Sequence, residues 1–123
     1  MTSKDFTIKL PENWKEELED FIYNFYDPNG NGAIQVSIHP HKNADLIGTL
    51  SKSAKIKGIT LIEKENSVET NFVRDSKYWK MKIVKSNHKI AFITYNCYND
   101  NIDPYEIRAV NRIFNSFKLK QIK

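Results

Sequence analysis

Apolar and polar residues alternate over much of the chain, with the two-residue spacing of β-strands. Phe6, Ile8 and Leu10 alternate with polar neighbours, which predicts a first strand that ends at Pro11. The acidic segment that follows fits either a turn of helix or a loop that carries Trp14 back over the core.

Two further alternating runs, DFIYNFYD and AIQVSIH, predict a β-hairpin. Their apolar positions are Phe21, Tyr23 and Phe25 in the first run and Ile34, Val36 and Ile38 in the second. Two Asn-Gly pairs lie between the runs. Asn-Gly is the strongest short-range signal for a hairpin turn because both residues tolerate positive φ angles.

The same stretch also resembles a calcium-binding loop, because Asp27, Asn29 and Asn31 alternate as ligands do in an EF-hand. An EF-hand requires a helix on each side and a bidentate glutamate at the twelfth position. The flanks here have the pattern of strands, and the twelfth residue is Ile38. The stretch is therefore interpreted as a hairpin turn.

The spacing becomes helical in the segment NADLIGTLSKSAKIKG, which predicts a helix between Asn43, as the cap, and Gly58, as the stop. The runs ITLIEKE, SVETNFVRD and KYWKMKIVK then predict three strands, and Trp79, Met81 and Ile83 face one way in the last of them. KIAFITYNCY is apolar on both faces, which favours a central strand.

The segment DPYEIRAVNRIFNSF predicts a C-terminal helix. Asp103 is in the position of an N-cap, Pro104 is at the first helical position, and Glu106 would complete a capping box. The predicted buried stripe consists of Ile107, Val110, Phe114 and Phe117.

These elements predict an α+β fold in one domain that spans residues 1–123. Short turns join the strands into a single twisted antiparallel sheet of about six to seven strands, and the two main helices cover it. A chain of 123 residues is long enough for one hydrophobic core and too short for two domains.

The sequence resembles the PsbP-like fold, which a photosystem II extrinsic subunit shares with a Ran-binding nuclear import factor. The resembling pieces are FTIKLPENW, FYDPNGNGAIQVSI, and KIAFITYNC followed by VNRIFNSFK. Many short bacterial domains of unknown function are similar in the same segments. The resemblance implies a non-enzymatic domain that binds another protein, and no motif here matches the binding surface of either named relative.

The composition is that of an ordinary globular protein, with 40% hydrophobic and 28% charged residues. No apolar run approaches the roughly 20 residues that span a bilayer, and the N-terminal sequence has no apolar signal region. The single cysteine, Cys97, fits a reducing compartment. We therefore expect a cytoplasmic protein that does not insert into membranes.

The net charge of +4 raises the possibility of nucleic-acid binding. The chain has only three arginines, the residue best suited to bidentate phosphate and guanine contacts. The lysines alternate along strands, as in KYWKMKIVK, in the way that solubilises a sheet face. Because a nucleic-acid footprint is clustered, nucleic-acid binding is the weakest of the functional hypotheses.

His39, His41, His88 and Cys97 are the residues that could form a metal or small-molecule site. His39 and His41 could point the same way, but two ligands do not complete a zinc site. Cys97 lies in an apolar strand without a motif that supplies a base. The glycines match no phosphate-binding pattern, so we expect neither catalysis nor a cofactor.

The segment TYNCYNDNIDPYE joins the last strand to the last helix and is rich in tyrosine and polar residues. Such a composition is typical of protein interfaces. The candidate interface residues are Tyr95, Tyr98, Asn99, Asp100 and Tyr105. The leading hypothesis is a non-catalytic domain, such as an immunity or accessory protein, that holds one unidentified protein partner.

Overall fold

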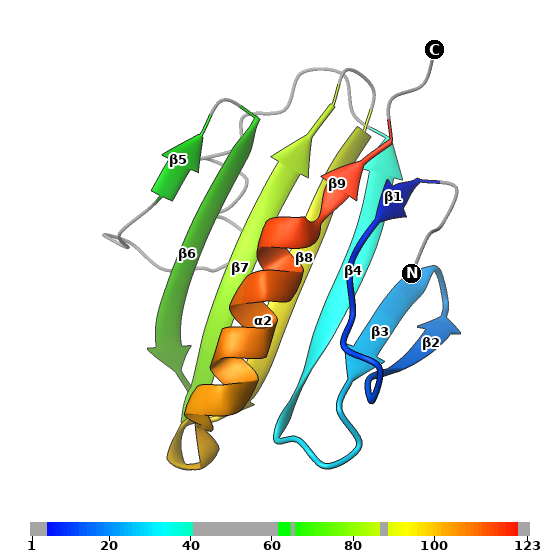
Figure 1. The fold of residues 1–123 in the computed structure, drawn as a ribbon. Helices are drawn as coiled ribbons and strands as arrows, with labels where there is room; N and C mark the ends of the chain where they lie inside the picture. The colour runs from blue at the N-terminus through cyan, green and yellow to red at the C-terminus, as the bar shows by residue number, and fades with distance from the viewer. Residues whose placement is uncertain (1–4, 41–61, 65, 87–88, 121–123) are drawn as a thin grey trace.

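A computed structural model describes residues 5–40, 62–64, 66–86 and 89–120, and within them one antiparallel sheet carries one α-helix on one face (Figure 1). The seven strands of this sheet are β2 (Lys15–Glu19), β3 (Ile22–Tyr26), β4 (Gly32–Pro40), β5 (Ile62–Lys64), β6 (Ser67–Arg74), β7 (Lys77–Lys85) and β8 (Lys89–Tyr98). Their spatial order is β2-β3-β4-β8-β7-β6-β5. The α+β class and the antiparallel sheet are therefore confirmed.

The long strand β8 occupies the middle of the sheet, as its apolar sequence predicts, between β4 and β7. The β3–β4 hairpin also forms, and its Asp27–Gly30 turn is closed by the Gly30 amide, which donates to the Asp27 carbonyl over 2.8 Å. The Asn-Gly stretch is therefore a hairpin loop between two strands, not an EF-hand.

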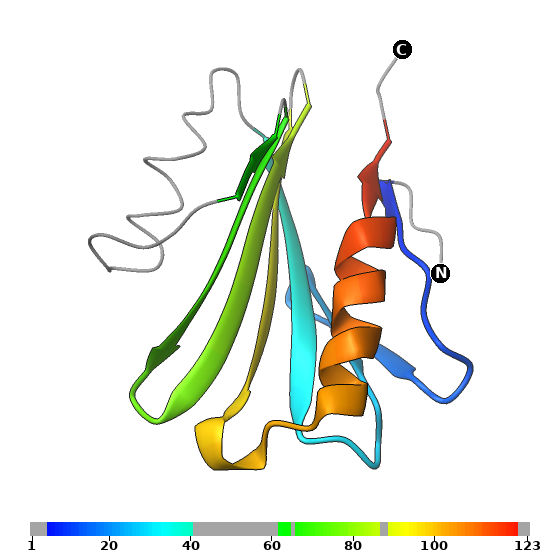
Figure 2. The ribbon, with the colours of Figure 1, turned by 60° about the vertical axis from the view of Figure 1, so that its left-hand side comes forward.

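The second structural layer consists of α2 (Pro104–Ser116) and the N-terminal segment, which lie on the same face of the sheet (Figure 2). Strand β1 (Phe6–Thr7) pairs with β9 (Lys118–Leu119) next to the end of α2. The Phe6 ring stacks on Phe117 with a 5.2 Å centroid separation. This contact joins both ends of the described chain to the core.

The main core fills the space between α2 and the sheet. Its fully buried members include Phe6, Phe25, Ile34, Val36, Ala91, Ile93, Tyr95, Val110 and Phe114. The predicted stripe of α2 is confirmed: Val110, Phe114 and Phe117 are buried, and Ile107 packs against them. Val68, Ile83 and Ile90 are buried on the other face of the sheet, where the alternation of strand side chains places them.

The start of α2 follows the prediction except at Glu106. Asp103 caps the helix by accepting a 2.9 Å hydrogen bond from the Tyr105 amide, and Pro104 occupies the first turn. Glu106 does not complete a capping box: its carboxylate accepts from Tyr95 and Asn31 and is only 7% exposed. Its partners lie 11 and 75 residues away in the sequence, outside the helix, so local helix rules could not identify them.

The lysines of β7 contradict the prediction of a solvated strand face. Lys80 and Lys82 are each 9% exposed and point toward α2. The Lys80 ammonium pairs with Glu69 at 2.5 Å and lies 5.2 Å from the centroid of the Phe114 ring. The Lys82 ammonium donates to the Phe114 carbonyl over 2.9 Å, which places a cation at the negative end of the helix.

The first strand is shorter than predicted, and the acidic segment after it forms the edge strand β2. The helical alternative for that segment is wrong, whereas Trp14 does reach the core, with 9% exposure. Phe21 does not share a buried face with Phe25, because it lies in the β2–β3 turn and is 92% exposed.

The prediction of two covering helices is not confirmed. The described residues contain the single α-helix α2, and the helix predicted over residues 43–58 lies outside them. Within the described residues, no helix is long and apolar enough to cross a membrane.

Candidate functional site

Three connecting segments meet at one end of the sheet, which we call the loop end and define by residues 27–31, 75–76 and 98–105 (Figure 1, bottom). A short 3₁₀ turn, η1 (Asn99–Asn101), follows β8. Its Asn99 amide donates to the Ser76 carbonyl over 2.8 Å, and its Asn101 carbonyl accepts from the Asn31 side chain over 2.8 Å. These two bonds fix the three segments to one another.

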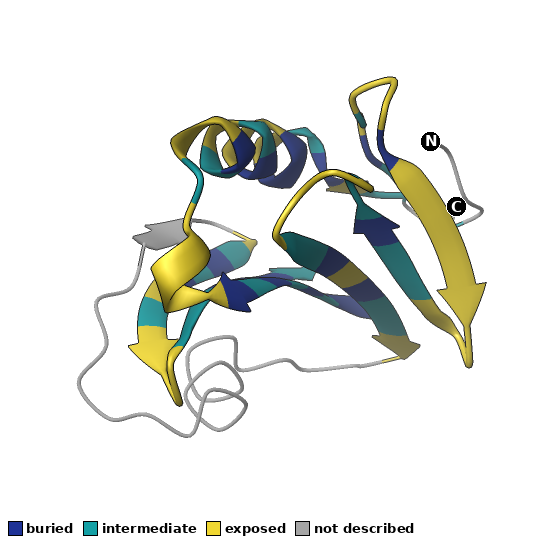
Figure 3. Cartoon of the chain, turned by 90° about the horizontal axis from the view of Figure 1, so that it is seen from below, coloured by how far each residue is buried: buried dark blue, intermediate teal, exposed yellow. Residues whose placement is uncertain are grey.

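Most of the candidate interface residues are on the surface of the loop end (Figure 3). Tyr98 is 60% exposed and Tyr105 is 76% exposed, and Asn99 and Asp100 are exposed between them. Ile102, with 40% exposure, adds an apolar side chain that the sequence did not single out.

Tyr95 is the exception among the candidate residues, because it is fully buried against α2 and offers no surface to a partner. Its hydroxyl donates to one oxygen of Glu106, and the other oxygen accepts from the Asn31 amide over 2.9 Å. Gly30 adjoins the same carboxylate: a Cβ there would lie 1.9 Å from Glu106 Oε1. Tyr95 and Glu106 therefore stabilise the loop end from the buried side, through their contacts with each other and with Asn31.

Burial raises the pKa of Tyr95 far above its ordinary value of 10.0, and the hydrogen bond to Glu106 raises it further. Burial likewise raises the pKa of Tyr78 on the neighbouring strand. The pKa of Tyr26 is raised chiefly by its hydroxyl's 2.9 Å hydrogen bond to Glu17. All three shifts favour the neutral phenol, and the Tyr95 and Tyr26 phenols donate hydrogen bonds to Glu106 and Glu17.

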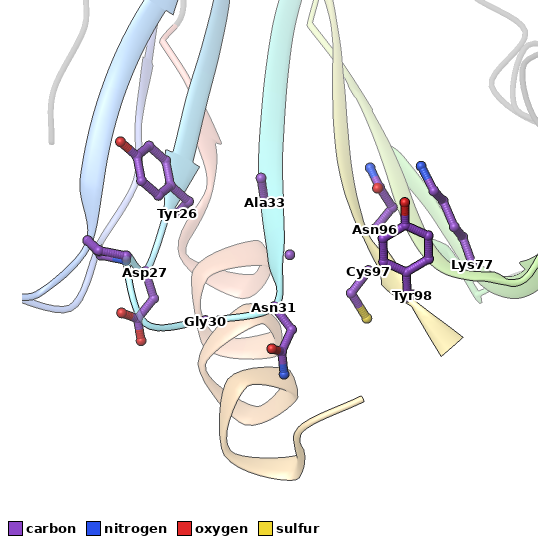
Figure 4. Close-up of a pocket in the computed structure, with 11 residues that line it drawn as sticks. Tyr26, Asp27, Gly30, Asn31, Ala33, Lys77, Asn96, Cys97 and Tyr98 are labelled. Carbon is purple, nitrogen blue, oxygen red and sulfur yellow. The ribbon is translucent and has the colours of Figure 1, made fainter. Parts of the chain in front are cut away.

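An open depression of about 390 Å³ lies beside the loop end (Figure 4). Asp27, Gly30 and Asn31 border it from the hairpin loop, and Lys77, Asn96, Cys97 and Tyr98 border it from β7 and β8. The Lys77 ammonium lies 5.4 Å from the centroid of the Tyr98 ring, and this cation–π contact restrains both side chains. The depression offers a carboxylate, amides and a cation for polar contacts.

The residues proposed for a metal or small-molecule site do not come together where the structure describes them. His39 pairs with Ile90 across the sheet, whereas Cys97 is seven positions further along β8, or about 23 Å at 3.3 Å per residue. His39 is exposed, and Cys97 is 3% exposed on the face that α2 covers. His41 and His88 lie outside the described residues. Among the residues that the structure describes, no group of three or more His, Cys, Asp or Glu side chains could hold a metal ion.

The solved structures that are similar to this chain include the following two. The structure of a protein from Bacteroides thetaiotaomicron matches with a TM-score of 0.65 at 11% identity, over 94% of this chain and 45% of that one. The chain thus spans less than half the length of that protein. The solution structure of cyanobacterial PsbP (CyanoP) from Synechocystis sp. matches with a TM-score of 0.58 at 10% identity, over 97% of this chain and 95% of that one.

These likenesses confirm the PsbP-like fold that the sequence suggests. No protein-family model matches the chain, and no curated protein matches it in sequence. At such low identity the similarity concerns the fold alone, and functional residues have to be inferred from this chain.

Proposed function

We propose that the chain is a non-catalytic, cytoplasmic protein-binding domain, of the immunity or accessory type, and that the loop end is its binding surface. The observation that carries the proposal is the exposure of Tyr98 and Tyr105, 60% and 76%, on a segment anchored at several points. Tyrosine is enriched among the residues that dominate interface energies, because it combines apolar area with a hydroxyl.

Restraint of both rings supports the same proposal. Lys77 lies over the Tyr98 ring, and the Arg108 guanidinium lies 5.3 Å from the centroid of the Tyr105 ring. A side chain that is already restrained loses less entropy on binding. The adjoining Asn99 and Asp100 supply polar groups of the kind that surround the apolar centre of an interface.

The proposal is tested by affinity capture with the tagged protein from its host, followed by a quantitative binding measurement on the captured partner. Tyr98→Ala combined with Tyr105→Ala should weaken binding more than tenfold, because truncation of a central tyrosine costs about 2 kcal/mol. A melting temperature close to that of the unaltered protein would show that both side chains act at the surface.

Phe21→Ala is the matched control, because Phe21 is an even more exposed aromatic residue at 92%. Phe21 is also separated from Tyr98 in the sheet. Its neighbour Ile22 pairs with Ser37, and Ser37 pairs with Phe92, which is six positions from Tyr98 along β8. Partner binding that survives the double tyrosine substitution, or that is lost only with Phe21→Ala, would contradict a role for the loop end.

A further inference from the structure

The outer edge of β2 is an exposed strand edge of the described sheet. All five residues of β2 are exposed, and the strand ends the sheet, with β3 as its one described neighbour (Figures 1 and 3). An unpaired strand edge presents a row of N–H and C=O groups that can pair with another extended chain.

The hairpin register identifies which backbone groups point outward. Glu19 pairs with Ile22 across the two-residue turn, so this closing pair exchanges its hydrogen bonds within the hairpin. Pairs alternate along an antiparallel ladder, so the amide and carbonyl groups of Glu16 and Leu18 are directed away from β3. They are the groups available to an added strand.

Three apolar side chains are exposed beside this edge, with fractions of 61% for Leu18, 92% for Phe21 and 38% for Ile22. Phe21 has a φ of 67° in the turn, a left-handed conformation that glycine or asparagine adopts far more easily. A phenylalanine there costs backbone free energy and hardly contributes to the core. An apolar contact with another molecule would account for it.

The charge on the edge is strongly negative in a chain whose net charge is +4. Residues 15–20 contain one lysine and the four acidic residues Glu16, Glu17, Glu19 and Asp20. By strand alternation, Glu17 and Glu19 share one face with Lys15, and Leu18 is on the face toward α2. A second copy of β2 paired with Leu18 opposite Leu18 would bring Glu17 against Glu19 and Glu16 against Asp20, which is repulsive.

We propose that β2 adds an extended segment of a partner protein in which lysine or arginine alternates with apolar residues. The basic side chains would lie beside Glu17 and Glu19, and the apolar ones would lie beside Leu18, with Phe21 covering the end of the added strand. Charged residues alone would serve to protect an edge from aggregation, but exposed Leu18 and Phe21 would not. This surface is separate from the loop end and does not depend on the function proposed there.

The test uses the full chain and a short capped peptide of alternating lysine and valine, with a glutamate–valine peptide as its matched control. Binding of the lysine peptide should slow hydrogen exchange at the Glu16 and Leu18 amides, while the Glu17 amide, which already faces β3, should change little. The glutamate peptide should not bind measurably.

Two variants distinguish the proposed contacts from nonspecific binding of the peptide. Glu17→Lys combined with Glu19→Lys should weaken binding of the lysine peptide roughly tenfold and allow the glutamate peptide to bind. Phe21→Gly should also weaken binding of the lysine peptide roughly tenfold, because apolar burial is lost. The melting temperature should rise, because glycine adopts the positive φ of the turn without strain.

Several results would overturn the proposal. They are equal binding of both peptides, no binding of the lysine peptide, protection at the β5–β6 edge instead of β2, and self-association that already protects Glu16 and Leu18 in the free protein. The last outcome would show a second copy of the chain as the occupant, and sedimentation would detect it.

Discussion

Replacement of Glu106 by alanine is the perturbation that most directly tests how the loop end is held. Glu106 is 7% exposed, and its two oxygens accept hydrogen bonds from the Tyr95 hydroxyl and the Asn31 amide. The substitution removes both bonds and leaves the hydroxyl of a fully buried tyrosine without its acceptor.

The expected cost follows from these contacts. A hydrogen bond to a charged group contributes about 1.5–3 kcal/mol, and a buried donor without a partner costs about 1–3 kcal/mol. These contributions overlap, because the orphaned hydroxyl is one side of a lost bond, so we expect Glu106→Ala to destabilise the fold by about 3–4 kcal/mol. That is a large fraction of the typical stability of about 5–15 kcal/mol.

A double-mutant cycle measured by urea unfolding checks this reasoning. Tyr95→Phe alone should cost about 1.5 kcal/mol, because it removes one charge-assisted bond and leaves the ring in place. Phenylalanine at position 95 leaves no orphaned hydroxyl, so the double variant should be more stable than the sum of the single effects predicts, by about 1–2 kcal/mol. Effects that add within about 0.5 kcal/mol would refute a direct bond, and Glu12→Ala, at an exposed site, is the control.

Three further predictions concern the same core. Gly32→Ala should destabilise the protein by about 2–3 kcal/mol in urea unfolding, because its Cβ would lie 2.3 Å from the Asn96 carbonyl oxygen and 2.8 Å from the Tyr95 ring; an unchanged midpoint would contradict the close packing. Lys82→Met should cost about 1–2 kcal/mol through the lost bond to the Phe114 carbonyl, and this loss should persist in high salt because the contact is buried. The pKa of Tyr95 is raised above 10.0 in the folded protein, so the contribution of Tyr95 to stability is complete below about pH 10, and above that pH the unfolding free energy should fall by up to about 1.4 kcal/mol per pH unit. Tyr95→Phe should make this fall with pH less steep, and an identical slope in the variant would argue against burial of the Tyr95 hydroxyl.

The strands and α2 could be predicted because their apolar residues follow the period of each element. The hairpin loop at residues 27–31 and the N-cap Asp103 could be predicted because asparagine, glycine and aspartate act locally there. Such signals require only neighbours in the sequence, and the structure confirms them.

The polar contacts of the core could not be predicted, because their partners are remote. Glu106 is 75 residues from Asn31, and Lys82 is 32 residues from Phe114. In sequence, an alternating lysine or a first-turn glutamate has the pattern of a solvated residue. Only the packing of α2 on β7 and β8 turns these charges inward.

The sequence wrongly predicts Tyr95 at the surface for a related reason. Strand β8 is apolar on both faces, so its alternation does not reveal which tyrosine faces α2 and which faces solvent. The register decides: Tyr95 lies opposite Ile34 and is buried, whereas Tyr98 lies opposite Lys77 at the strand end and is exposed.

The two proposed surfaces should respond differently when Glu106 is replaced, because they depend on different parts of the core. Glu106 connects the hairpin loop, through Asn31, to β8, through Tyr95. Tyr98 lies three residues after Tyr95, and Tyr105 directly precedes Glu106. Strand β2 is attached through its pairing with β3.

At a temperature where Glu106→Ala is still folded, capture of the partner at the loop end should therefore fall, although both exposed tyrosines remain. Binding of the lysine–valine peptide to β2 should keep its affinity, measured on the same sample by fluorescence anisotropy. A parallel loss of both activities would mean that the substitution loosens the whole sheet, and would refute the view that Glu106 acts locally on the loop end.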